Sequence, residues 1–272
     1  MTTSQFAAGF EFGIACDSGR KRKNEPNQDS VKLILPGVSD EFPPLLVVAD
    51  GMGGYQGGAI ASKLIVDTIH DEYIRSERSS WDRSVLLESI QKSHQVIRVQ
   101  AEKDTSLSSM GSTVVAAILD QNHMEVINVG DSRAYLLRGN EVLQLSQDQS
   151  IVAEQMRAGL LSPEEARNHP KRSRLSMSIS AKRPEIKPYI TESNIYPEDI
   201  IVLCSDGLWS VVPDSLIWAA ATEFPPQEAA GKLIALANAS QGPDNISVII
   251  ARRAEWKNPQ ANIDMEETNP GE

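Results

Sequence analysis

Residues 47–54 read Val-Val-Ala-Asp-Gly-Met-Gly-Gly, an apolar run that ends in an aspartate and a group of glycines. The run Leu45–Ala49 is short and continuous, which is typical of a strand buried on both faces. Asp50 follows it directly, and a carboxylate at the end of a buried strand loses solvation unless another charge compensates it. The glycines after it allow close approach of the backbone to a ligand. The stretch therefore predicts a buried strand that leads into an acidic turn.

Apolar residues on either side of this stretch alternate in some segments and recur at helical spacing in others. The alternating segments and short apolar runs predict strands at residues 10–14, 31–35, 45–49, 112–119, 125–129, 134–138, 142–145, 186–190, 200–204 and 246–251. Helical spacing predicts helices at residues 58–74, 85–99, 214–223 and 227–239. The helices come in pairs and no regular βαβ alternation is present. The pattern predicts an α+β fold of two antiparallel sheets with helices packed outside, and the strands of residues 112–145 are expected to form one antiparallel sheet.

Two segments are expected to lie apart from the sheets. Residues 149–180 contain a short helix that ends near Gly159 and a second that begins at Ser162, whose capping box Glu165 closes. The rest of that segment is polar and basic, so we expect a helical flap beside the sheets. Residues 254–272 are rich in Asn, Pro and Glu, which predicts a disordered acidic tail after a domain of residues 1–253.

Composition limits the partners of the chain. Its 272 residues include 26 Lys and Arg against 37 Asp and Glu, a formal net charge of -11. Nucleic acid and anionic membranes require a basic surface, so neither is expected as a partner. The two cysteines, Cys16 and Cys204, indicate a reducing compartment, and no signal peptide or membrane-length apolar run is visible. We expect a cytoplasmic monomer.

Aspartates that follow strands or stand at turns are the most informative residues. They are Asp29, Asp50, Asp131, Asp206 and Asp244. If these carboxylates converge, their mutual repulsion requires a cation, and ligation by oxygen alone suits Mg²⁺ or Mn²⁺. The carbonyl of Gly51 is a candidate further ligand. Asp-Gly pairs are also common in ordinary turns, so spacing alone does not establish that the aspartates meet.

Seven segments together resemble the PPM family of metal-dependent phosphatases, the protein phosphatase 2C type, in its bacterial form. They occur in the family's order at residues 27–29, 50–54, 110–113, 129–135, 145–150, 203–208 and 244–247. The resemblance covers the chain from Gly19 to Arg253. It implies an α-β-β-α sandwich with a centre of two Mg²⁺ or Mn²⁺ ions that hydrolyses phosphoserine and phosphothreonine by direct attack of water. The implied substrates are phosphoproteins, and the implied enzyme counteracts a serine/threonine kinase.

The resemblance also implies individual roles for residues of this chain. The matches to the ligands of the two ions are Asp29, Asp50, the Gly51 carbonyl, Asp206 and Asp244. Asp131 together with Asp206 matches a third, weaker metal position.

The chain departs from the family pattern near the first motif. Gln28 stands where the family usually has Glu, which predicts a weaker metal site. The family's phosphate-binding arginine is expected five residues before Asp29, but that position is Asn24. An insertion in this loop lets Arg22 or one of its basic neighbours reach the phosphate, and we take Arg22 as the candidate.

Two other functions are compatible with parts of the sequence. A catalytically silent member of the family could bind phosphoproteins or sense metal, although a binding protein has no need of five aspartates. A cysteine-dependent phosphatase needs an arginine six positions after its cysteine, and Arg22 stands six after Cys16. The residues between them lack a glycine-rich phosphate cradle, which disfavours this chemistry.

Overall fold

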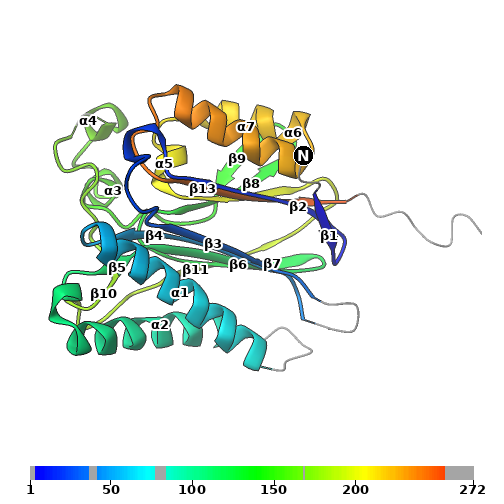
Figure 1. Ribbon diagram of the computed structural model, residues 1–272. Helices are drawn as coiled ribbons and strands as arrows, with labels where there is room; N and C mark the ends of the chain where they lie inside the picture. Colours follow the sequence, from blue (N-terminus) through cyan, green and yellow to red (C-terminus); the bar gives the residue numbers. More distant parts are fainter. Residues whose placement is uncertain (1–3, 37–41, 77–83, 168, 255–272) are drawn as a thin grey trace, which may run out of the picture.

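The computed structural model describes residues 4–36, 42–76, 84–167 and 169–254. Two antiparallel sheets lie face to face, and helices cover the outer face of each (Figure 1). Sheet I has the strand order β1 (Gln5–Ala7), β2 (Phe10–Asp17), β13 (Ile246–Arg253), β12 (Ile200–Cys204), β8 (Arg133–Arg138) and β9 (Glu141–Gln144). Sheet II has the order β10 (Ile179–Ser180), β5 (Gly111–Ser112), β4 (Leu45–Met52), β6 (Val114–Asp120), β7 (His123–Val129) and β11 (Tyr189–Asn194), with β3 (Asp29–Ile34) also paired to β4. The predicted α-β-β-α sandwich is confirmed.

Strand β4 shows why the sandwich forms. Its residues Leu45, Val47 and Ala49 pack toward the helices, whereas Leu46 and Val48 pack into the layer between the sheets. Successive side chains of a strand point to opposite faces, so a strand with two buried faces needs a continuous apolar run.

The helix pairs cover the outer faces of the two sheets. Helices α1 (Tyr55–Arg75) and α2 (Ser84–Lys103) pack on sheet II, and α6 (Asp214–Glu223) and α7 (Pro226–Ala239) pack on sheet I. Three buried apolar clusters result, one under each helix pair and one between the sheets. Among the described residues, no helix is both long and apolar enough to cross a bilayer.

The strands of residues 112–145 do not form one sheet, contrary to the sequence prediction. Strands β6 and β7 pair in sheet II, whereas β8 and β9 pair in sheet I. The chain changes sheets at residues 130–132. Gly130 has a φ of 108°, a left-handed conformation that glycine adopts without strain, and a Cβ there would collide with Thr113. This crossing carries Asp131.

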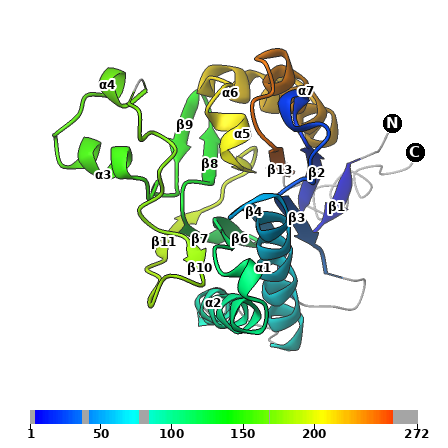
Figure 2. The ribbon, with the colours of Figure 1, turned by 60° about the vertical axis from the view of Figure 1, so that its left-hand side comes forward.

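The flap is present as a helical segment beside the sandwich. Helices α3 (Ile151–Arg157) and α4 (Pro163–Arg167) stand to one side of both sheets (Figure 2). The predicted capping box is confirmed: the Glu165 N–H donates to Ser162 Oγ at 3.2 Å, and the Ser162 N–H donates to Glu165 Oε2 at 2.8 Å. The segment returns to sheet II through β10.

One predicted strand is misplaced, and the predicted tail lies outside the described residues. The strand expected at residues 186–190 is β11, which begins at Tyr189. Pro188 lacks an N–H to donate to a ladder, so pairing begins after it. The tail beyond Ala254 is not among the described residues. Short elements without a clear pattern complete the chain: η1 (Arg20–Arg22), η2 (Thr105–Leu107) and α5 (Asp206–Trp209).

Candidate metal centre and phosphate-binding residues

All five predicted aspartates lie at the same end of the sandwich. Asp29 begins β3, and its register partner on β4 is Asp50. Asp206 directly follows β12, and Asp244 lies just before the adjacent strand β13. Asp131 lies in the crossing from β7 to β8. Strand ends from both sheets thus bring together carboxylates that are up to 215 residues apart in sequence, which is the separation between Asp29 and Asp244.

The structure corrects one detail of this placement. Strand β4 does not end at Ala49 but continues through Asp50 to Met52, where it pairs with β5. Asp50 therefore projects from a paired strand, whose backbone is held on both sides, rather than from a free turn.

Burial raises the pKa of each of the five aspartates, and repulsion from other aspartates of the set adds to the rise at Asp29, Asp50, Asp131 and Asp206. Burial, together with the charges of Asp206 and Asp244, raises the pKa of Asp29 to about 7. Burial and the charge of Asp244 raise the pKa of Asp206 to about 6. The pKa of Asp50 lies well above its ordinary value because of burial and then the charges of Asp29, Asp206, Asp131 and Asp244. The charges of other aspartates of the set thus contribute to the raised pKa values of Asp29, Asp50 and Asp206, which indicates that these carboxylates lie near one another.

Burial is also the largest cause of the raised pKa at the remaining two aspartates. Burial and then the charges of Asp206 and Asp148 raise the pKa of Asp131 well above its ordinary value. Burial raises the pKa of Asp244, while the Asn245 N–H and Arg22 oppose the rise. A cluster whose members all resist ionisation is stabilised by any cation placed among them.

Two buried carboxylate oxygens in this cluster have no hydrogen-bond partner among the described residues. They are Asp29 Oδ1 and Asp206 Oδ1. The other oxygen of Asp29 accepts from Ser205 Oγ at 2.7 Å. Buried polar atoms are nearly always paired, so two bare anionic oxygens beside one another's charges indicate a ligand that supplies positive charge. This donor set, all of it oxygen, fits Mg²⁺ or Mn²⁺.

The side chains of the cluster do not by themselves form the arrangement of a metal site. Among the described residues, no three His, Cys, Asp or Glu side chains are gathered in the arrangement of a metal site. The expected ligands include the Gly51 carbonyl as well as side chains.

The backbone at Asp50 is held by the motif at residues 110–113. The Asp50 N–H donates to Thr113 Oγ1 at 3.1 Å, and the Asp50 carbonyl accepts from Ser112 Oγ at 2.8 Å. Thr113 Oγ1 also lies 2.7 Å from Ser132 Oγ, beside Asp131. Gly51 lies so close to the Gly58 carbonyl on α1 that a Cβ at either glycine would collide. The motif thus holds the backbone of Asp50 and lies beside Asp131, while Gly51 is buried against α1.

Arg22 lies beside the cluster and not out in solvent. Its Nη2 donates to Asp244 Oδ2 at 2.9 Å. The η1 turn that carries it is attached to the loop before Asp244, because the Lys21 N–H donates to the Gly242 carbonyl at 3.0 Å and the Arg20 N–H donates to Asn238 Oδ1 at 3.1 Å. The η1 turn therefore places the Arg22 guanidinium against Asp244.

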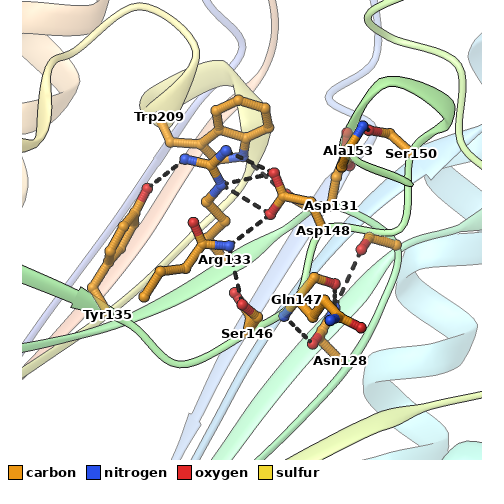
Figure 3. Close-up of polar contacts among 12 residues, drawn as sticks. Asn128, Asp131, Arg133, Tyr135, Ser146, Gln147, Asp148, Ser150, Ala153 and Trp209 are labelled. Carbon is orange, nitrogen blue, oxygen red and sulfur yellow. Dashed lines mark hydrogen bonds and ion pairs between the residues drawn. The ribbon is translucent and has the colours of Figure 1, made fainter. Parts of the chain in front are cut away.

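A hydrogen-bonded network around Arg133, which the sequence did not reveal, supports Asp131. The Arg133 guanidinium lies 3.6 Å from the centroid of the Trp209 ring and forms an ion pair of 2.6 Å with Asp148 (Figure 3). Arg133 Nη1 also donates to the Tyr135 hydroxyl at 2.9 Å. Trp209 Nε1 donates to the Asp131 carbonyl at 2.9 Å. Arg133 and Asp148 lie within the motifs at residues 129–135 and 145–150, and this position was the signal that could have revealed the network.

Gln149 joins the same crossing to the far end of the flap. Its Oε1 accepts from the Gly130 N–H at 2.8 Å, and its Nε2 donates to the Lys187 carbonyl at 2.8 Å. The turn that carries Asp131 is therefore tied to the chain on both sides of the flap.

A family model described as "Protein phosphatase 2C" matches residues 17–232. The chain belongs to the protein phosphatase 2C family. The serine/threonine phosphatase Stp of Listeria monocytogenes is 34% identical over 246 residues, which cover 87% of this chain and 93% of the relative. The chain is thus a serine/threonine protein phosphatase, in a family whose catalysis depends on metal.

Solved protein phosphatase 2C structures agree with the fold. A crystal structure of the Mycobacterium tuberculosis serine/threonine phosphatase PstP/Ppp has a TM-score of 0.81 and 32% identity, covering 90% of this chain and 99% of that one. A second structure, the PstP catalytic domain in complex with two manganese ions, has a TM-score of 0.78 and 31% identity over the same shares of the two chains. The relatives named here are phosphatases, so the alternative of a catalytically silent binding protein is not favoured.

The cysteine-dependent alternative finds no support. Cys16 lies in β2, with its Sγ 3.2 Å from Ser247 Oγ and accepting from Asn27 Nδ2 at 3.1 Å. Burial raises the pKa of this thiol, whereas a catalytic cysteine requires a lowered one. Arg22 is bonded to Asp244 and forms no cradle with Cys16.

Proposed function

We propose that this chain hydrolyses phosphoserine and phosphothreonine in phosphoproteins at a centre of two Mg²⁺ or Mn²⁺ ions. The proposed ligands, direct or through water, are Asp29, Asp50, the Gly51 carbonyl, Asp206 and Asp244, with Asp131 and Asp206 for a third ion. Bound together, two such ions would lower the pKa of a shared water and screen the charge of the phosphoryl oxygens.

The observation that carries the proposal is the pair of buried, unpartnered oxygens, Asp29 Oδ1 and Asp206 Oδ1, within a cluster of raised pKa values. The chain supplies the rest of the chemistry by position. Thr113 and Ser112 hold the backbone of Asp50, and Ser205 orients Asp29 through one of its two oxygens. Preorganised groups of this kind need no reorganisation during the reaction. Electrostatic stabilisation by such groups is usually the largest single contribution to catalysis.

Arg22 is the proposed ligand of the substrate phosphate. Its guanidinium lies at the edge of the cluster, with a third of the side chain exposed, and it presents several N–H donors. Arginine suits a phosphate because its donors form a planar fork. The proposal places the phosphate between Arg22 and the metal centre.

The biological setting belongs to the same proposal. The phosphatase domain is proposed to span residues 1–253, with the flap at 149–180 and an acidic tail at 254–272. The protein is proposed to act as a cytoplasmic monomer that opposes a serine/threonine kinase. The acidic composition, with a net charge of -11, supports a partner that is neither nucleic acid nor membrane.

Release of phosphate from p-nitrophenyl phosphate and from a phosphothreonine peptide, measured across a Mn²⁺ titration, tests the proposal. We expect activity that requires Mn²⁺ and is lost in Asp206→Asn. Asp71→Asn is the matched control, because Asp71 is an exposed aspartate of α1 that pairs with His70. Wild-type protein that releases no phosphate from either substrate at any Mn²⁺ concentration would refute the proposed function.

A further inference from the structure

Gln28 stands where the family pattern has Glu, and it is buried beside the aspartate cluster with only 5% of its surface exposed. Its neighbours assign the orientation of its amide. The NH₂ group lies 3.3 Å from the Gly51 carbonyl, and the amide oxygen lies 3.2 Å from Arg22 Nη1. Gln28 therefore joins the proposed phosphate ligand to the one backbone carbonyl in the proposed metal set.

The position of this side chain is set by the backbone on both sides. The Gln28 N–H donates to Asn245 Oδ1 at 2.9 Å, and the Gln28 carbonyl accepts from the Gly51 N–H at 3.0 Å. A Cβ at Gly58 would collide with the Gln28 amide, so α1 closes the remaining side. The amide has little freedom to turn away from Arg22.

A neutral amide can make both contacts at once, whereas an ionised carboxylate cannot. A carbonyl oxygen needs a donor and a guanidinium needs an acceptor, and glutamine offers one of each. A glutamate in the same place would accept from Arg22 but would face the Gly51 carbonyl with a second acceptor. The neutral residue is therefore matched to an arginine that enters from the inserted turn.

Arg22 has two anchors of different kinds. Asp244 Oδ2 accepts from its Nη2 at 2.9 Å, but Asp244 is also a proposed metal ligand, and its Oδ1 already accepts from the Asn245 N–H at 2.7 Å. When Asp244 serves as a ligand, its hold on Arg22 is shared. Gln28 is neutral and keeps its acceptor for Arg22.

We propose that Gln28 is a positioning residue that holds Arg22 against the metal centre for binding of the substrate phosphate. This inference rests on the proposed function of the site and adds a residue that acts through Arg22 and touches no substrate. It predicts that removal of the amide weakens phosphate binding without removing the metal centre.

The test compares wild-type protein with Gln28→Met, Gln28→Glu, Arg22→Met and the double variant Gln28→Met/Arg22→Met. Gln241→Met is the matched control, because Gln241 is an exposed glutamine whose Oε1 accepts from Lys21 Nζ at 3.1 Å in the same pair of loops. Three quantities are measured: KM and kcat for p-nitrophenyl phosphate, the Kd of Mn²⁺ by calorimetry, and the Kd of inorganic phosphate for the Mn²⁺-loaded protein.

We expect Gln28→Met to raise KM and the phosphate Kd by about tenfold, the order expected for loss of one hydrogen bond to a charged group, with kcat and the Mn²⁺ Kd changed by less than about threefold. Gln28→Glu should also raise both phosphate constants, because its carboxylate neutralises Arg22. The double variant should bind phosphate no more weakly than Arg22→Met, since a residue that acts through Arg22 has nothing left to position.

Contrary results are distinct from failure of the proposed function. An unchanged KM and phosphate Kd in Gln28→Met and Gln28→Glu would overturn the inference. A double variant whose phosphate Kd rises by the product of the two single-variant factors would also overturn it. If Gln28→Met fails to fold, Gln28→Glu decides by the same phosphate constants. An inactive wild-type protein would refute the proposed function, while the phosphate Kd of the variants would still support or refute the role of Gln28.

Discussion

Two clusters of buried charge lie side by side at this end of the molecule, and they are built in opposite ways. In the Arg133 network, the carboxylate of Asp148 receives two N–H groups from Arg133 and one from Gln144, and the arginine also meets Tyr135 and Trp209 (Figure 3). In the aspartate cluster, carboxylates from both sheets face one another and two of their oxygens have no partner.

The difference separates a structural cluster from a ligand site. A buried charge is tolerated when a partner of opposite sign compensates it, as in the pair of Arg133 and Asp148. The aspartate cluster is compensated only in part. Arg22 pairs with Asp244, Arg133 opposes the rise in the pKa of Asp131, and hydrogen bonds oppose it at Asp29 and Asp206, yet all these pKa values stay raised. The two clusters touch through Trp209, whose indole N–H holds the backbone of Asp131.

The largest expected effect comes from the uncompensated cluster. Asp206→Asn should lower kcat/KM by about a hundredfold to a thousandfold, the range found when one preorganised electrostatic group is removed from an active site. The same change should raise the melting temperature of the metal-free protein, because it removes a buried like charge. Scanning calorimetry with and without Mn²⁺ checks this, and a lower melting temperature in the metal-free variant would contradict the contrast between the clusters.

The compensated cluster should respond in the opposite direction. Arg133→Met leaves Asp148 without its ion pair and should destabilise the protein by about 2–4 kcal/mol, or roughly 5–10 °C in melting temperature. Chemical denaturation in the presence and absence of Mn²⁺ measures the change. Arg75→Met is the control, since it removes an exposed pair with Glu72 that is worth less than about 1 kcal/mol. Equal changes in the free energy of unfolding for the two substitutions would show that the Arg133 network does not stabilise the fold.

Stability of the metal-free protein should fall as pH rises. The folded-state pKa values of Asp29, about 7, and Asp206, about 6, lie above those of an unfolded chain. Their contribution to stability is therefore complete below about pH 4 and is lost as pH rises through 6 and 7. We expect the loss of this contribution to lower the melting temperature of the protein by roughly 5 °C between pH 5 and pH 8. Saturating Mn²⁺ should abolish that decrease. An identical pH profile in Asp29→Asn would contradict the assignment.

The smallest expected effect concerns metal affinity at Gln28. Gln28→Glu adds a carboxylate beside the cluster, so the Mn²⁺ Kd should fall by about threefold to tenfold, an effect of the order of one added electrostatic contact. Calorimetric titration with Mn²⁺ measures it directly. An unchanged Mn²⁺ Kd would show that the residue at this position reaches Arg22 and not the metal centre.

Local patterns in the sequence were enough to predict most of the architecture. The continuous run at Leu45–Ala49 predicted a strand buried on both faces, and the capping box at Ser162 predicted the start of α4. Such features depend on neighbours within a few residues. The strand at 186–190 was misplaced because Pro188 displaces pairing toward the polar residues of β11, where apolar alternation is weak.

Local patterns in the sequence predicted only part of the candidate site. The five aspartates were identified from their place at strand ends, but the donors that align them were not. Ser205 reaches Asp29 across 176 positions of sequence, and Trp209 reaches the Asp131 carbonyl across 78. No local pattern records contacts of that separation.

The sequence by itself determined the class of fold, the family and the residue types at the centre, because strand periodicity, turn chemistry and carboxylate spacing are properties of short segments. Only the tertiary structure decided that the chain changes sheets at Gly130, that the η1 turn brings Arg22 to Asp244, and that Gln28 joins Arg22 to Gly51. Those contacts exist because the packing of two sheets brings distant strand ends to one edge. The charge of each carboxylate is then set by burial and by neighbours that are remote in the chain.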